Sequence, residues 1–209
     1  MAKSKPKDNS TFREKKALRL RALADLAALG IDQPTIMETH GGAGKLWAAC
    51  YAELAQPGVV FEKDPKKAER LAQQRPAWAV YEGDCENALR EGIGGHVVVD
   101  LLDVAPWGSS WEAIEGFMSS RRPFADQMVV VVNDGLRQAL SMGAAWSIKV
   151  MQPYVERFGN DSIYRDYPDL CREMLQDKAT AASYTVSRFV SYTAGAKQFE
   201  VHMLALLVR

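Results

Sequence analysis

Cysteine and histidine are both scarce in this sequence, with three of each among 209 residues. The cysteines lie far apart and form no C-x-x-C pair, and the histidines show no spacing typical of metal ligands. Zinc sites use closely spaced Cys and His ligands, and disulfide frameworks need paired cysteines. We therefore expect no metal site and no disulfide, and the composition fits a reducing cytoplasm.

Long apolar runs are missing as well. The first ten residues, MAKSKPKDNS, are polar and charged, and no apolar run approaches the length of about 20 residues that spans a bilayer. We expect a soluble, cytoplasmic protein without a membrane segment. With 47% hydrophobic residues the chain can bury one core, so we expect a single domain at 12–209 after a disordered basic tail at 1–11.

A net charge is also absent, because 26 basic side chains balance 26 acidic ones. Their distribution is uneven, since the segment up to Arg21 carries eight Lys and Arg but only two Asp and Glu. A basic N-terminal segment is typical of nucleic-acid contact, and it is equally typical of a solvated tail. Charge alone leaves both interpretations open.

Apolar residues recur at helical spacing from Phe12 to Leu29, and Gly30 follows as a stop signal. Beyond it, strand and helix patterns alternate. The strands are expected at Thr35–Glu38, Val59–Glu62, Trp78–Tyr81, His96–Leu102 and Met128–Val132, and the helices between them at 44–55, 65–75, 85–91 and 110–120. Short β-branched runs are typical of strands buried on both faces, so the alternation predicts a doubly wound α/β sheet.

The end of the chain breaks this alternation. Two strand patterns, Tyr184–Tyr192 and Phe199–Val208, are separated only by residues 193–198, which is too short for a parallel crossover. The sequence therefore predicts a mostly parallel, seven-stranded sheet that ends in an antiparallel hairpin. The polar and aromatic stretch 160–169 before the hairpin is interpreted as a packed loop rather than as part of a ligand pocket.

The stretch ETHGGAGKLW (38–47) joins the first strand to the next helix, where nucleotide-like ligands commonly bind. As a P-loop, G-x-x-x-x-G-K-[ST], it fails at Thr39 and Leu46. As a dinucleotide-binding loop, G-x-G-x-x-G, it fails at Trp47, where the third glycine lets helix and strand pack closely.

A third pattern, E/D-x-G-x-G-x-G, is matched by Glu38, Gly42 and Gly44, with His40 in place of the first glycine. This resembles motif I of the class I S-adenosylmethionine-dependent methyltransferases, whose fold has the same terminal hairpin. The resemblance implies S-adenosylmethionine as cofactor, with the glycines next to its methionine and ribose and Glu38 orienting the loop. Gly41 lies next to His40 and can supply part of the backbone freedom that the missing glycine would give.

The next two strands end in acids at the positions that the resemblance implies for the cofactor. Glu62, followed by Lys63, ends the second strand, and such a carboxylate accepts both ribose hydroxyls in the family. Asp84 follows the third strand, where the family's acid accepts from the adenine amino group and the next amide, here Cys85, recognises a ring nitrogen. Asp64 is expected to cap the helix that begins at Pro65.

After the fourth strand the chain reads VDLLDVAPWGSSW (99–111), which resembles motif IV of the tRNA guanine dimethyltransferases. The resemblance implies that Trp107 stacks on a base and that Asp103 contacts the acceptor, while Asp100 orients the cofactor loop. Ala105 departs from the pattern where the family has an acid before the proline. Asp134, after the fifth strand, is the reserve carboxylate.

These residues predict a methyltransferase that acts on a base nitrogen in nucleic acid, with RNA favoured over DNA. A sulfonium is an activated donor, so the site needs alignment rather than a catalytic triad or a metal. Two alternatives stay open. One is a non-catalytic module of the same fold that binds RNA or a partner protein, and the other is a methyltransferase for small molecules or proteins.

Overall fold

The computed structural model describes residues 11–143, 145–195 and 197–209, so the expected tail at 1–11 lies outside it except for Thr11. Thr11 is buried and is the N-cap residue of the first helix. The elements follow in this order: α1 (Phe12–Ala28), β1 (Ile36–Glu38), α2 (Lys45–Cys50), β2 (Val59–Glu62), α3 (Pro65–Gln74), β3 (Ala79–Glu82), α4 (Cys85–Arg90), β4 (Leu101–Val104), α5 (Trp111–Met118), β5 (Gln127–Asp134), α6 (Leu136–Leu140), two 3₁₀ turns (Ala145–Ser147 and Lys149–Met151), α7 (Gln152–Phe158), α8 (Asn160–Thr180), β6 (Thr185–Ala194) and β7 (Glu200–Val208).

One seven-stranded sheet runs through the molecule in the order β3-β2-β1-β4-β5-β7-β6. The first five strands pair in parallel, and β7 pairs antiparallel with both β5 and β6. This confirms the predicted doubly wound sheet and its C-terminal hairpin. The order reverses between β1 and β4, which is where open α/β sheets bind ligands, beyond the carboxyl ends of the strands.

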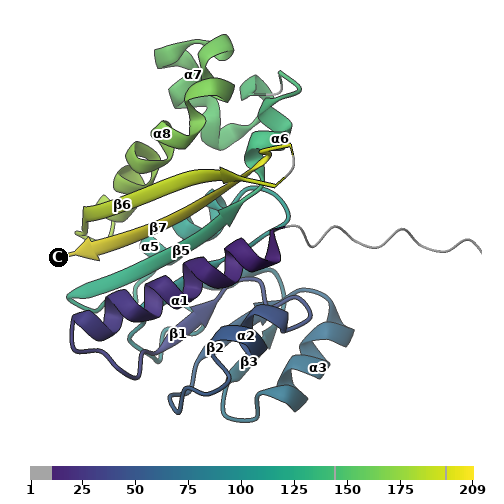
Figure 1. Ribbon diagram of the computed structural model, residues 1–209, viewed down its shortest axis with the longest axis vertical. Helices are drawn as coiled ribbons and strands as arrows, with labels where there is room; N and C mark the ends of the chain where they lie inside the picture. The colour runs from purple at the N-terminus through teal and green to yellow at the C-terminus, as the bar shows by residue number, and fades with distance from the viewer. Residues whose placement is uncertain (1–10, 144, 196) are drawn as a thin grey trace, which may run out of the picture.

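Helices cover both faces of the sheet (Figure 1). Helices α1, α2 and α3 lie on one face, and α5 and α8 lie on the other. The larger apolar core is on the α5 and α8 side, and it takes up alternate residues of β7, among them Val201, Met203, Ala205 and Leu207. The smaller core lies under α1 and includes Leu18, Ala22 and Leu26 of that helix. The sheet is therefore buried on both faces, as the β-branched runs predict.

Side-chain caps fix the starts of α3 and α4, and so the loops that precede them. Asp64 directly precedes Pro65, and its carboxylate accepts from the backbone N–H of Lys66 at 3.0 Å. This confirms the predicted cap. Asp84 caps α4 in the same way by accepting from the N–H of Glu86 at 2.9 Å. Each cap satisfies a helical donor that would otherwise be unpaired, and each lies at the carboxyl end of a strand.

The fourth strand begins later than predicted, at Leu101 rather than His96. Its ladder starts where Ile36 of β1 pairs with Leu101, so the residues before it have no neighbouring strand on that side. Val98 is 44% exposed, unlike a residue of a strand covered on both faces. Asp100 therefore precedes β4, and its carboxylate accepts from the N–H of Thr35 at 2.8 Å.

The expected loop at 160–169 is wrong, because these residues form the first half of α8. Ile163, Tyr167, Leu170 and Met174 recur at helical spacing and are buried against the core. Pro168 removes one helical hydrogen bond, but packing of this apolar face keeps the helix continuous.

No helix in the described part of the chain is long and apolar enough to cross a membrane. Within the same residues, no group of three or more His, Cys, Asp and Glu side chains is placed to hold a metal ion.

Candidate active site

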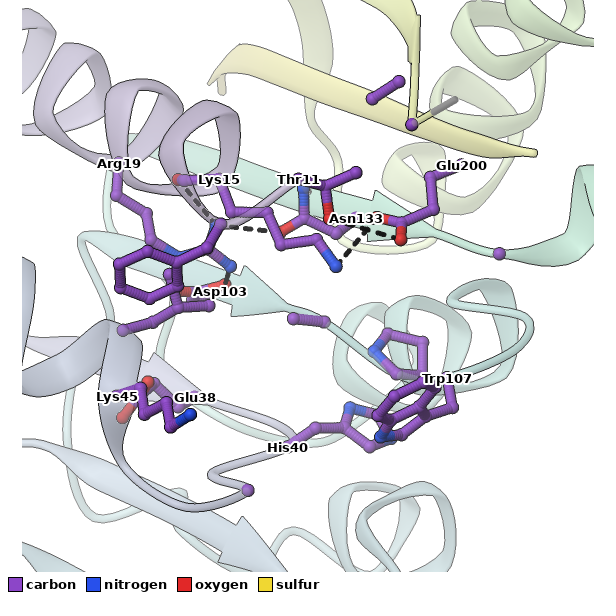
Figure 2. Close-up of a pocket in the computed structure, with 18 of the residues that line it drawn as sticks. Thr11, Lys15, Arg19, Glu38, His40, Lys45, Asp103, Trp107, Asn133 and Glu200 are labelled. Carbon is purple, nitrogen blue, oxygen red and sulfur yellow. Dashed lines mark hydrogen bonds and ion pairs between the residues drawn. The ribbon is translucent and has the colours of Figure 1, made fainter. Parts of the chain in front are cut away.

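A cavity of about 540 Å³ opens at the carboxyl ends of the central strands (Figure 2). Its walls come from five segments that are distant in the sequence. These are the start of α1, the glycine loop with the start of α2, the end of β4 with residues 105–107, the end of β5 with α6, and the turn between β6 and β7. Figure 2 shows Lys15 and Arg19 on the α1 side and Glu38, His40 and Lys45 on the side of the glycine loop.

The glycine loop has the backbone shape that only glycine adopts without strain. Gly42 and Gly44 have φ angles of 55° and 74°. Gly41 is needed for a different reason, because a Cβ there would lie 2.6 Å from both Val60 and Leu71. Its N–H donates to the Phe61 carbonyl at 2.9 Å, so the loop lies directly on β2.

His40 occupies the first-glycine position and crosses from the loop toward α4. Its Nδ1 is 2.8 Å from the Thr39 hydroxyl, and its Nε2 is 3.5 Å from Cys85 Sγ. Burial lowers the pKa of His40 to about 4, so the imidazole is neutral at physiological pH. The departure from the glycine pattern therefore places a neutral aromatic ring between the glycine loop and Cys85, one of the predicted cofactor contacts.

Glu38 forms a buried ion pair with Arg75, which lies at the end of α3. The guanidinium of Arg75 lies 4.8 Å from the ring of Trp47 and 5.1 Å from that of Trp78. Burial raises the pKa of Glu38 to about 7, although the Arg75 cation opposes the rise. The predicted role of Glu38 in orienting the loop thus depends on a cation that the sequence analysis missed.

The predicted ribose and adenine contacts lie beside the loop. Glu62 Oε2 accepts from the N–H of Gly42 at 2.7 Å, and Oε1 accepts from the N–H of Asp64 at 2.9 Å. Lys63 and Asp84 are exposed, and Cys85 is buried. These residues follow neighbouring strands β2 and β3 but are not among those that line the open cavity.

Asp100 is the exception among the predicted cofactor residues. It precedes β4, while the glycine loop follows β1, and these strands are parallel. Asp100 therefore lies at the amino ends of the parallel strands, whereas the cavity lies at their carboxyl ends. It cannot orient the cofactor loop.

Asp103 borders the cavity, but its carboxylate is fully engaged. It is only 2% exposed, accepts from Arg19 Nε at 2.7 Å and accepts from the Tyr51 hydroxyl at 2.8 Å. Arg19 comes from α1 and is completely buried. The expectation of a free acceptor-binding carboxylate at Asp103 does not fit this geometry, which makes Asp103 part of a buried ion pair.

The same ion pair corrects the interpretation of the N-terminal charges. From Phe12 onward they belong to a packed helix rather than to a free arm. Arg19 forms a buried ion pair with Asp103, and Lys15 pairs with Glu200 of β7 at 2.7 Å. Hydrogen bonds from His202 and Lys15 outweigh burial and lower the pKa of Glu200 to about 2.

Asp134 lies at the end of β5 but faces the interior and does not line the cavity. It accepts from Ser110 N–H at 2.9 Å, from the Tyr167 hydroxyl at 2.7 Å and from Leu136 N–H at 3.0 Å. Tyr167 in turn accepts from the indole N–H of Trp111 at 2.7 Å. Asp134 therefore holds the loop before α5 in place and is not the reserve carboxylate.

The loop between β4 and α5 places Trp107 at the edge of the cavity. It is 93% exposed, although it lines the cavity together with Ala105 and Pro106. The N–H of Gly135 donates to the Gly108 carbonyl at 2.9 Å, which ties the loop after β4 to the end of β5. An exposed indole on a fixed loop has its ring face free to stack on a flat ligand.

Solved structures with the same fold include several proteins at low sequence identity. NodS, an N-methyltransferase from Bradyrhizobium japonicum in complex with S-adenosyl-L-homocysteine, is 13% identical, with a TM-score of 0.59 over 97% of this chain and 89% of that one. TYW2 of M. jannaschii in complex with AdoMet is 11% identical, with a TM-score of 0.59 over 97% and 77%.

Trm1 of Pyrococcus horikoshii, in complex with S-adenosyl-L-methionine, is 10% identical, with a TM-score of 0.64 over 94% of this chain. The chain spans 55% of that longer protein. The fold is that of the class I methyltransferases. No sequence-family model matches this chain, and no curated protein does.

Sequence reasoning on this methyltransferase fold missed the polar residues between α1 and the cavity, above all Arg19 and Asn133. Asn133 precedes Asp134, the last residue of β5, is 2% exposed, and accepts from Arg19 at 2.8 Å. One signal was available, because Arg19 directly follows Leu18 on the face of α1 that carries Ala22. An arginine next to the apolar stripe of a packed helix must find a buried partner.

Proposed function

We propose that this protein transfers a methyl group from S-adenosylmethionine to a base nitrogen in RNA. The observation that carries the proposal is the convergence of the glycine loop, Glu62 and Asp84 next to an open cavity with Trp107 on its rim. When bound, the cofactor supplies a methyl group on a sulfonium, a donor that needs alignment but no further activation.

The residues present fit this cofactor. Each oxygen of Glu62 accepts one backbone N–H and keeps a lone pair for a ribose hydroxyl. Asp84 is exposed beside it for the adenine amino group. Gly42 leaves room for the backbone to approach the ligand, since a Cβ there would meet nothing within 4 Å, whereas Gly44 is needed for packing on α3, because its Cβ would lie 2.9 Å from Gln74.

RNA is supported as acceptor by an aromatic ring and basic side chains around the opening. Trp107 offers an exposed ring for base stacking, which contributes about 1–3 kcal/mol per base. Lys45 and Lys197 also line the cavity. The basic segment with Lys3, Lys5 and Lys7 directly precedes Thr11, itself a lining residue.

Two measurements test the proposal. Calorimetry with S-adenosylhomocysteine should detect binding, and absence of binding at millimolar ligand would refute the cofactor assignment. Labelled cofactor is then incubated with separate pools of tRNA, rRNA, DNA, cell protein and small metabolites. Label in RNA is the expected result, whereas label only in protein or metabolites would refute the RNA assignment and leave the methyltransferase assignment in place.

A non-catalytic RNA-binding module is the second candidate, and two departures favour it. His40 fills the first-glycine position and contacts Cys85, and Ala105 removes the side-chain partner of the acceptor. This candidate predicts RNA binding that is unchanged by cofactor and no transfer to any pool. Gel-shift titrations with and without S-adenosylhomocysteine separate the two functions.

Replacing Glu62 with alanine should weaken S-adenosylhomocysteine binding by about 1.5–3 kcal/mol, because a charged hydrogen-bond acceptor for the ribose is lost. Calorimetry measures the change. Lys66→Ala is the control, since Lys66 is an exposed residue of the neighbouring α3. Equal affinity in wild type and Glu62→Ala would remove the ribose contact from this position.

Replacing Trp107 with alanine should raise the acceptor's apparent Michaelis constant by a factor that corresponds to about 1–3 kcal/mol. The side chain is 93% exposed, so the free energy of unfolding should change by less than about 0.5 kcal/mol. Steady-state kinetics on the labelled pool and urea denaturation measure the two quantities. Trp107→Phe keeps an aromatic face and should recover much of the affinity; an unchanged constant in Trp107→Ala would exclude stacking.

A further inference from the structure

The carboxylates of the described residues around the cavity all pair with cations, so none presents an uncompensated negative charge to an acceptor amino group. Three carboxylates line it, and each has a cationic partner among the described residues: Glu38 with Arg75, Asp103 with Arg19, and Glu200 with Lys15. Ala105 adds no polar side chain where the resembling family has an acid. The N–H groups of an exocyclic amine would therefore find no free carboxylate.

Asn133 presents a donor instead, and its orientation is fixed by chemistry. A guanidinium can only donate, so the atom 2.8 Å from Arg19 Nη1 must be the amide oxygen of Asn133. The amide nitrogen then has no hydrogen-bond partner within the described residues, although Asn133 is 2% exposed and lines the cavity. An unpaired buried donor is costly, and a ligand oxygen would satisfy it.

Cations outnumber carboxylates around the same space. Lys15, Arg19, Lys45 and Lys197 line it against the three engaged carboxylates. In the described part of the chain, Lys45 and Lys197 form no ion pair with a carboxylate, and Lys197 lies 5.8 Å from the ring of Phe199. Such a lining stabilises negative charge on a bound group.

We propose that the acceptor nitrogen is the ring N–H of a lactam or imide, which reacts as its conjugate base, rather than an exocyclic amino group. In such a ring the nitrogen is adjacent to a carbonyl, which accepts from the Asn133 amide. The N–H proton leaves to solvent, and the nitrogen lone pair forms a bond to the methyl carbon. The carbon–sulfur bond breaks, and its electron pair stays on sulfur, which becomes a neutral thioether. This inference rests on the proposed methyl transfer.

Identification of the methylated atom tests the inference on the wild-type protein. RNA labelled in the transfer assay is digested to nucleosides, which are separated and fragmented by mass spectrometry. A methyl group on a ring nitrogen next to a carbonyl, as in guanine or uracil, is the expected result. A methyl group on an exocyclic amine, or on a ring nitrogen that is not an N–H next to a carbonyl (N3 of cytosine included), would overturn it. If the label is in another pool, the same criterion applies to the product found there.

Asn133→Asp is the matched variant, because it keeps an oxygen for Arg19 and replaces the amide donor with an acceptor. We expect kcat/KM for the acceptor to fall about tenfold or more, with S-adenosylhomocysteine affinity within about twofold of wild type. Unchanged kcat/KM in a variant that still binds S-adenosylhomocysteine would overturn the role of Asn133. Urea denaturation shows whether the variant is folded.

The failure of the proposed function has a different signature. If S-adenosylhomocysteine does not bind, or binds without transfer to any pool, the methyltransferase assignment is refuted and this inference with it. If the wild type transfers methyl groups to exocyclic amines, only this inference fails.

Discussion

Replacing Arg19 with methionine should lower the free energy of unfolding by about 3–5 kcal/mol, the cost of leaving one member of a buried ion pair without its partner. Arg19 is fully buried and connects α1 to Asp103 of β4 and Asn133 of β5. Methionine fills much of the volume of the arginine side chain. The loss of stability therefore reflects the uncompensated charge of Asp103 rather than a cavity. Urea denaturation at pH 7 measures it.

Arg21→Met on the same helix is the control. The Arg21 side chain is 65% exposed, and its partner Asp25 is buried but also pairs with Arg188, so losing Arg21 leaves Asp25 compensated and should cost about 0–1 kcal/mol. In the double variant Arg19→Met with Asp103→Asn, much of the loss should be recovered, because the unpaired charge is removed as well. A loss in Arg19→Met no larger than that in Arg21→Met would contradict the importance of the buried pair.

Replacing Arg75 with methionine should also destabilise the protein by about 3–5 kcal/mol at pH 8, and by less at pH 5. Burial raises the pKa of Glu38 to about 7 even with Arg75 present. Without the cation the pKa rises further, so Glu38 is protonated in the folded variant at pH 5. Below about pH 7 both folded proteins keep this proton and lose stability alike as the unfolded chain ionises. Above about pH 7 wild-type Glu38 ionises beside Arg75, and the loss continues only in the variant, so the deficit grows there.

Arg70→Met controls for the loss of a cation from α3, because Arg70 is exposed on that helix. Methionine at position 75 keeps apolar contact with Trp47 and Trp78, between which the guanidinium now lies. Denaturation of wild type and variants at pH 5, 6, 7 and 8 gives the pH dependence. A deficit of Arg75→Met that does not grow with pH would show that Glu38 is not the group left unpaired.

The order of strands and helices was predictable because it depends on local patterns. Buried β-branched runs, caps such as Asp64 and the short connection before β7 each act within a few residues. The prediction failed where a local pattern was overridden by packing. Residues 160–169 looked like a loop because of their polar side chains and Pro168, yet the buried face of α8 holds them in a helix.

The methyltransferase fold, the glycine loop and the acids after β2 and β3 were predictable from the sequence, because each occupies a set place in an alternating chain. The partners of the carboxylates depend on tertiary packing instead. Asp103 meets Arg19 across 84 residues and Glu38 meets Arg75 across 37, so neither partner could be read from spacing. A charge that is buried during folding must be neutralised by a partner that the packing of distant elements brings within reach.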